Sequence, residues 1–172
     1  MADRTALEVK GFIFEGFIGI YLHNNFNKSF HYYNKKFESS LLKKGETQID
    51  LIFITSRAIF VIEAKNWSQF ISGTYDDYEW TGMGDAHKVM KVFSPVYQNY
   101  YHLRLLKAAM SKKEKDLPPF YNLVVVPDGC EIRTECEEVV NVSSLKNKII
   151  EKARLSTKEY NLNKLYSLVA DA

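Results

Sequence analysis

The stretch QIDLIFITSRAIFVIEAK, residues 48–65, decides the fold. It consists of two apolar runs, 48–55 and 58–65, that are rich in β-branched and aromatic residues and are separated only by Ser56 and Arg57. This pattern is typical of a β-hairpin. If the turn holds those two residues, the cross-strand partner of residue i is residue 113 − i, and Asp50 faces Glu63.

Side chains two positions apart on a strand share a face, so Gln48, Asp50, Glu63 and Lys65 are expected to project from the same side of this hairpin. Opposed carboxylates repel each other, by about 3 kcal/mol at ~5 Å and an effective dielectric near 20. A hard divalent cation beside Lys65 would neutralise this repulsion. The alternative is an ordinary salt bridge between Asp50 and Lys65 on an exposed face.

The composition predicts one folded domain over residues 1–172. Hydrophobic residues make up 46% of the chain, and the net charge of +2 permits a nucleic-acid partner without demanding one. Cys130 and Cys136 have no second pair or His cluster near them, which argues against zinc and favours a reducing compartment. No apolar run reaches the ~18 residues needed to cross a bilayer. We therefore expect a cytoplasmic protein with no membrane partner.

The rest of the chain predicts helices and strands in alternation. Apolar positions at steps of three and four indicate an amphipathic helix up to Leu22, which includes Ile13 and Phe17. A strand over 29–33, a polar connection over 34–45, the hairpin and a short strand over 78–81 follow. A helix over 95–111, strands over 120–126 and 139–142, a helix capped by Ser143 or Ser144, and a last helix over 162–169 complete the order. This is an α/β domain with a mixed central sheet flanked by helices.

Four segments resemble the nuclease-related domain (NERD) family of the PD-(D/E)xK nuclease superfamily. They are KGFIFE (10–15), TQID (47–50), FVIEAKNW (60–67) and PVYQNYYH (95–102). The resemblance implies a restriction-endonuclease-like core, α-β-β-β-α-β, with additional C-terminal helices. It places the motif-bearing core at about residues 5–126 and leaves about 127–172 as a C-terminal extension.

The resemblance also implies a role for each residue that matches a motif. Asp50, Glu63 and the backbone carbonyl of Ala64 would bind Mg²⁺ or Mn²⁺, which prefer oxygen ligands. Lys65 would orient water or stabilise developing charge. Glu15 would approach the ion from the first helix, and Gln98 would contact Lys65 or the nucleic-acid backbone; the alternatives are an exposed Glu15 and a merely polar helix start at Gln98.

Six further residues have a functional and a structural interpretation. Gln48, Glu46 and His102 could support the site, or they could fill the sheet face, a solvated loop and a half-buried helix position. Lys88 and Lys91 could contact phosphates, although lysine-rich loops are usually only solvated. Trp67 could stack on a base, although tryptophan more often packs in a core.

The leading hypothesis is a metal-dependent nuclease, a hydrolase of phosphodiester bonds that acts on DNA. The alternative is a binding or accessory module that retains the nuclease fold but has little or no activity. A homodimer that cuts both strands is compatible with the sequence. A helicase-like or other DNA-processing partner, supplied in trans, is compatible with it as well.

Overall fold

The observed elements follow the predicted order. The computed structural model describes residues 6–38, 46–84 and 87–172. The helices are α1 (Ala6–Asn25), α2 (Pro95–Ser111), α3 (Val142–Arg154) and α4 (Leu162–Ala170). The strands are β1 (Phe30–Glu38), β2 (Glu46–Ile54), β3 (Ile59–Ala64), β4 (Phe70–Ser72), β5 (Glu79–Met83), β6 (Val89–Phe93), β7 (Phe120–Val126), β8 (Glu131–Arg133) and β9 (Val139–Asn141).

A mixed five-stranded sheet forms the centre, in the order β1-β2-β3-β7-β9. β1, β2 and β3 are antiparallel neighbours, whereas β7 is parallel to both β3 and β9. The parallel pairing of β3 with β7 requires a crossover, and α2 lies within that connection. The order α1-β1-β2-β3-α2-β7 confirms the predicted α-β-β-β-α-β core, which is the restriction-endonuclease-like arrangement.

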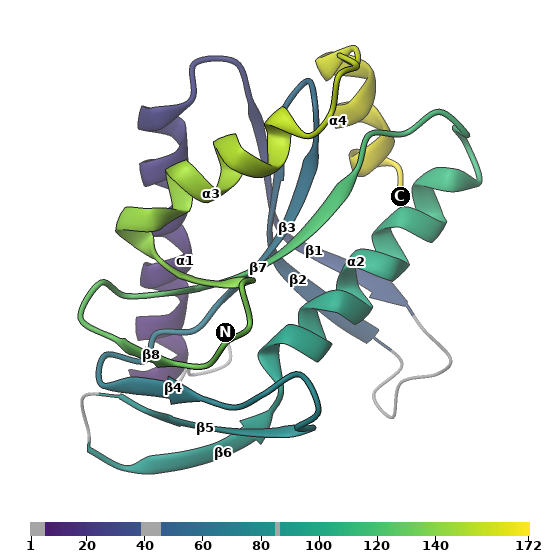
Figure 1. Ribbon diagram of the computed structural model, residues 1–172. Helices are drawn as coiled ribbons and strands as arrows, with labels where there is room; N and C mark the ends of the chain where they lie inside the picture. The colour runs from purple at the N-terminus through teal and green to yellow at the C-terminus, as the bar shows by residue number, and fades with distance from the viewer. Residues whose placement is uncertain (1–5, 39–45, 85–86) are drawn as a thin grey trace.

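Helices cover both faces of this sheet (Figure 1). One face packs against α1 and α3, in a core that contains Leu51, Phe53, Phe60 and Ile62. The other face packs against α2 and α4, in a core that contains Ile52, Ile54, Ile59 and Val61. β2 and β3 are apolar on both faces because each face is covered.

A second sheet, in the order β6-β5-β4-β8, lies beside the first (Figure 1). The sequence predicts only β5 of these strands. β4 and β8 span three residues each, which is too short for a periodic signal. Apolar and polar residues do not alternate along β6, because the apolar Val89 and Phe93 lie on its exposed side.

Two predicted boundaries are wrong for tertiary reasons. β1 continues to Glu38, where a polar connection is expected, because an edge strand tolerates charged residues such as Lys35 and Lys36; residues 39–45 of that connection lie outside the described part. α3 begins at Val142 rather than after a serine cap. The backbone N–H of Ser143 instead donates to Asp128 Oδ1 at 2.8 Å, so a distant loop residue caps the helix.

The first helix is confirmed, but fewer of its apolar residues are buried than the spacing predicts. Phe14, Ile18 and Leu22 are buried, at the helical spacing of four. Ile13 and Phe17, which the spacing also assigns to the packed face, are 63% and 51% exposed. They lie about 100° around the helix from their buried neighbours, and the sheet covers only one stripe.

Candidate functional site

The hairpin between β2 and β3 has the predicted register. Leu51 pairs with Ile62 and Ile54 with Ile59, so each pair of numbers sums to 113. Thr55 closes the turn, because its Oγ1 accepts from the backbone N–H groups of Arg57 and Ala58. Beyond the ladder, Asp50 Oδ2 accepts a hydrogen bond of 2.9 Å from the backbone N–H of Ala64. Asp50 therefore lies beside the Glu63–Lys65 segment.

Glu63 is the centre of the site. Its side chain is 2% exposed, and its two oxygens have different surroundings. Oε1 accepts from Lys65 Nζ at 2.6 Å and from Gln98 Nε2 at 2.8 Å. Oε2 has no hydrogen-bond partner among the residues that the structure describes, and it lies 3.6 Å from His102 Nδ1. One oxygen is therefore held from two sides, while the other is buried without a hydrogen bond from the described residues.

α2 delivers two of these partners. Its N-terminus is set by Ser94, whose Oγ accepts from the backbone N–H of Tyr97, and by Pro95 at the first helical position. Gln98 and His102 are one turn apart and therefore project in the same direction. His102 is 2% exposed, and its Nε2 is hydrogen-bonded to Thr47 Oγ1 at 2.8 Å.

Burial shifts the pKa values of the site. Burial raises the pKa of Glu63 to about 7, with the charges of Asp50 and Glu15 adding to the effect and Lys65 opposing it. Burial also raises the pKa of Asp50, against the lowering effect of the Ala64 N–H and Lys65. His102 is affected in the opposite direction: burial and the charge of Lys65 lower its pKa to about 4. Burial thus disfavours the charged forms of Asp50, Glu63 and His102.

A break in strand alternation changes the role expected of Gln48. Ile49 and Ile52 pack in the same core although they are three positions apart, and Leu51 packs on the other face. The pairing register places Asn34, with φ of 51°, opposite this break. Gln48 is consequently directed to Asn34, and its Nε2 donates to Asn34 Oδ1 at 2.6 Å. The expectation that Gln48 shares a face with Lys65 is wrong, because it assumed strict alternation.

The structure places the other predicted residues as follows. Glu15 on α1 is near enough for its charge to raise the pKa of Glu63. Glu46 is exposed and lies 3.6 Å from Lys36 Nζ. Lys91 pairs with Glu79 at 2.8 Å, and Lys88 is exposed just before β6. Asp50, Glu63, Lys65, Gln98 and His102 are therefore brought together, whereas Glu46, Lys88 and Lys91 have other surroundings.

Trp67 lies in the interior. Its side chain is 7% exposed and packs in a core cluster between the two sheets. A Cβ added to Gly82 would lie 2.2 Å from its ring, so the ring covers this glycine closely. Stacking of a base on Trp67 would require the second sheet to move away.

Sequence reasoning missed two residues of the site. Thr47 holds His102, and the motif TQID contained it without indicating a role. Asn99 is fully buried on α2, where its Nδ2 donates to the backbone carbonyls of Val61 at 2.8 Å and Leu123 at 2.9 Å. It fastens α2 to β3 and β7 and thereby fixes the helix that carries Gln98. The motif PVYQNYYH contained Asn99 without indicating a role for it.

The donor atoms fit a hard divalent cation. Asp50 and Glu63 offer carboxylate oxygens, and Glu63 Oε2 is buried without a partner. In the described part of the chain, no three His, Cys, Asp or Glu side chains are close enough to form a complete metal cage. The side chains at hand therefore suit an ion that completes its shell with backbone carbonyls and water, as Mg²⁺ does, better than zinc.

The chain is similar to known proteins over part of its length. The family model described as nuclease-related domain (NERD) matches residues 10–127. An uncharacterized protein of Bacillus anthracis is 36% identical over 61 residues, which are 36% of this chain and 28% of that relative. The chain thus matches less than a third of the relative's length. No solved structure matches it. None of the described helices has both the length and the apolarity needed to span a bilayer.

Proposed function

Because the chain belongs to the family of nuclease-related domains, we propose that it hydrolyses phosphodiester bonds of DNA with the help of Mg²⁺ or Mn²⁺. One observation carries this proposal: the buried Glu63 is held through Oε1 by Lys65 and Gln98, and its Oε2 has no partner. A buried carboxylate with an unsatisfied oxygen is costly to a fold, and a bound cation would remove that cost.

Asp50 and Glu63 would hold the ion through their carboxylates, and the carbonyl of Ala64 would complete the protein's share. A divalent cation supplies two effects to phosphodiester hydrolysis, a lower pKa for water and neutralisation of charge on the phosphoryl oxygens. Its positive charge would also favour the ionised forms of both carboxylates, whose pKa values are raised by burial.

Lys65 and Gln98 have distinct tasks in this proposal. The Lys65 ammonium is a compact donor at the edge of the site, where it can orient water or stabilise charge on the phosphate. Gln98 is a positioning residue that keeps Glu63 Oε1 in place. Glu15 contributes negative charge from α1 and increases the attraction for a cation.

The test is a titration of Mg²⁺ and Mn²⁺ into the wild type and the Asp50→Ala and Lys65→Ala variants. Thermal melting and cleavage of plasmid and single-stranded DNA are followed together. We expect metal-dependent stabilisation and cleavage in the wild type. Asp50→Ala should lose both, whereas Lys65→Ala should lose cleavage but retain a metal-dependent melting shift. Lys28→Ala, at an exposed position in the turn between α1 and β1, controls for removal of one positive charge.

Two results would count against the proposal in different ways. Metal-dependent stabilisation without cleavage of any DNA or RNA would indicate a binding or accessory module that uses the same pocket. No response to either ion, with the Asp50→Ala variant melting like the wild type, would mean that the hairpin carboxylates are not a metal site.

A further inference from the structure

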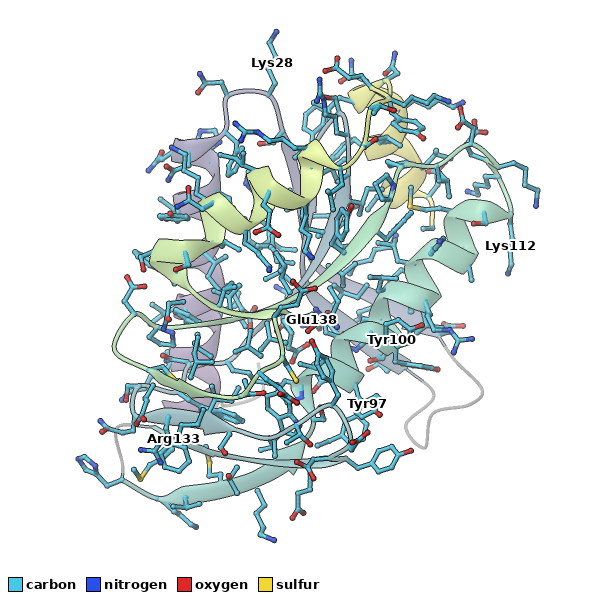
Figure 2. The ribbon with its side chains drawn as sticks, in the orientation of Figure 1. Lys28, Tyr97, Tyr100, Lys112, Arg133 and Glu138 are labelled. Carbon is cyan, nitrogen blue, oxygen red and sulfur yellow. The ribbon has the colours of Figure 1, made fainter. Side chains whose placement is uncertain are left out.

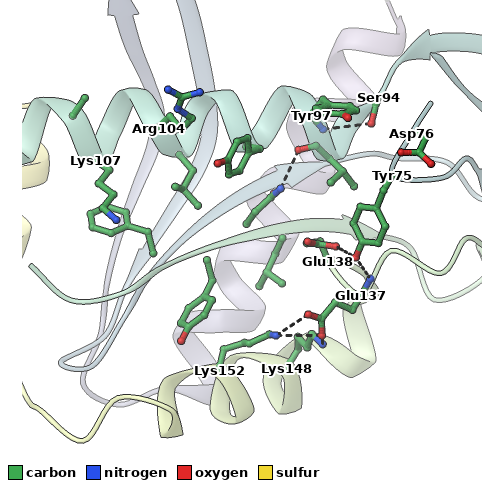
Figure 3. Close-up of a pocket in the computed structure, with 18 of the residues that line it drawn as sticks. Tyr75, Asp76, Ser94, Tyr97, Arg104, Lys107, Glu137, Glu138, Lys148 and Lys152 are labelled. Carbon is green, nitrogen blue, oxygen red and sulfur yellow. Dashed lines mark hydrogen bonds and ion pairs between the residues drawn. The ribbon is translucent and has the colours of Figure 1, made fainter. Parts of the chain in front are cut away.

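A second site lies away from the hairpin carboxylates. A cavity of about 900 Å³ opens between α2 and α3 (Figure 3), and Asp50, Glu63 and Lys65 do not line it. Its volume lies in the range of small-molecule sites, roughly 300–1,000 Å³. The first half of β7 forms the floor of the cavity. β9 pairs only with Val124–Val126, so Phe120–Leu123 have no strand beside them on that side in the described part of the chain. The short β9 thus creates the space.

Aromatic rings supply much of the lining. Phe120 and Tyr121 rise from β7, and Tyr97 and Tyr100 come from one face of α2. Tyr97 stacks on Tyr78, with ring centroids 5.2 Å apart and planes 18° from parallel. Tyr78 is 70% exposed, and Tyr100, which lines the cavity beside Tyr97 (Figure 2), is 51% exposed. An exposed tyrosine ring offers a flat surface to a planar ligand.

One end of the cavity is basic. Lys107 reaches in from α2, and its Nζ lies 5.8 Å from the centroid of the Phe120 ring. On the opposite wall, Lys148 and Lys152 of α3 bind the carboxylate of Glu137, at 3.0 Å and 3.1 Å, and Lys148 Nζ also lies 3.8 Å from Glu151 Oε1. Both lysine side chains are largely buried, with 15% and 18% exposed. These two ammonium groups are thus matched by two carboxylates, and Lys107 is a cation that the cavity offers to a ligand.

The other end is acidic. Tyr75, Asp76 and Glu138 lie there (Figure 3), and the Tyr75 hydroxyl donates to Glu138 Oε2 at 2.7 Å. A ligand that matches both ends therefore has an anionic group, a planar body and hydrogen-bond donors opposite the anion. An extended peptide could pair with the open edge of β7, but its neutral backbone would leave the charge of Lys107 unmatched.

We propose that this cavity binds a nucleotide, with its phosphate at the Lys107 end, its base against the tyrosines and an amino group of that base at the Glu138 end. Carboxylates accept hydrogen bonds from such amino groups. The nucleotide is either free or one unit of a single strand. The site goes beyond the hydrolytic centre, and its occupation does not require catalysis.

The test measures binding by the full chain in the presence of a chelator, which prevents cleavage. The probes are dAMP, deoxyadenosine and a fluorescent single-stranded oligonucleotide. We expect Lys107→Ala to weaken dAMP more than deoxyadenosine and to reduce the slope of log K against log salt for the oligonucleotide by about 0.7. Tyr100→Ala should weaken binding roughly 5- to 150-fold, and Tyr100→Phe, which keeps a ring, should restore most of it.

The two sources of the nucleotide give different results. Saturable dAMP binding that displaces the oligonucleotide identifies a free-nucleotide site, whereas binding of the oligonucleotide alone identifies a unit of a strand. Lys28→Ala removes one charge at an exposed site remote from the cavity (Figure 2) and should bind all probes like the wild type. If Lys107→Ala and Tyr100→Ala also bind like the wild type, while melting normally, the cavity is not a nucleotide site.

The Asp50→Ala variant separates this proposal from the hydrolytic one. It should bind dAMP in chelator like the wild type, because Asp50 does not line the cavity. Loss of cleavage in Asp50→Ala with binding retained supports both proposals independently. If the wild type cleaves no DNA, the Lys107 and Tyr100 variants still decide whether the cavity binds a nucleotide.

Discussion

His102 Nδ1 lies 3.6 Å from Glu63 Oε2, and neither atom has a hydrogen-bond partner in the described part of the chain. Their pKa values are shifted in opposite directions, to about 4 for His102 and to about 7 for Glu63. Burial therefore favours the protonated carboxyl of Glu63 and the neutral imidazole of His102, which are the uncharged forms of the two groups. Each shift is equivalent to roughly 3 kcal/mol of stability, with opposite dependence on pH.

Replacement of Glu63 should change the way in which the free energy of unfolding depends on pH. Its raised pKa contributes stability that is fully present below pH 4.5 and is lost as the pH rises through about 7. Glu63→Gln removes that contribution, so its stability relative to the ion-free wild type should fall by roughly 3 kcal/mol between pH 7 and pH 4.5. Urea unfolding in chelator at several pH values measures this difference. A difference that does not vary with pH would contradict the raised pKa.

Replacement of His102 should have the reverse effect. Its lowered pKa contributes stability that is fully present above pH 6.5 and is lost as the pH falls through about 4. The stability of His102→Gln relative to the wild type should therefore rise by roughly 3 kcal/mol between pH 6.5 and pH 4. The same urea experiment applies, with the exposed His87→Asn variant as control. Equal pH profiles for the two histidine variants would show that His102 is not perturbed.

The hydrogen bond from Gln98 to Glu63 predicts an effect on metal affinity. Gln98→Ala should weaken Mg²⁺ or Mn²⁺ binding about 10- to 100-fold, because partners that orient a ligand contribute on that scale. Gln48→Ala is the matched control, since Gln48 contacts Asn34 instead of the site. Calorimetric titration of both variants measures the effect. Similar weakening in the two would indicate a general loss of structure.

Asn99 should matter for stability rather than for chemistry. Asn99→Ala leaves the carbonyls of Val61 and Leu123 without their buried donor and opens a small void. We expect the free energy of unfolding to fall by roughly 2–4 kcal/mol. Asn24→Ala, on the exposed side of α1, should change it by less than about 0.5 kcal/mol. Comparable effects at the two positions in urea unfolding would refute the anchoring role.

Two glycines should respond in opposite ways to alanine. At Gly82 a Cβ would lie 2.2 Å from the ring of Trp67, which is buried and has little room to move, so Gly82→Ala should cost about 1–3 kcal/mol. At Gly16 in α1 a Cβ meets nothing within 4 Å, so Gly16→Ala should stabilise the protein by up to about 1 kcal/mol. Thermal unfolding distinguishes them. Stabilisation by Gly82→Ala would mean that Trp67 packs elsewhere in solution.

The hairpin could be predicted from sequence because its information is local. Two apolar runs and a two-residue turn define a register, and the observed pairs of Leu51 with Ile62 and Ile54 with Ile59 follow it. Gln48 could not be predicted in the same way. The break in alternation beside it is tied to Asn34, which lies on another strand and has a positive φ that no property of residues 48–65 reveals.

The sequence by itself determined the hydrophobic pattern, the core α-β-β-β-α-β and the proximity of Asp50 to the Glu63–Lys65 segment. These depend on periodicity, turn length and pairing between segments that are close in the chain. Only the tertiary structure decided that Thr47 would hold His102, that Asp128 would cap α3 and that Trp67 would be buried under the second sheet. Such contacts join segments that are distant in the chain, and burial by those segments sets the pKa values of Glu63 and His102.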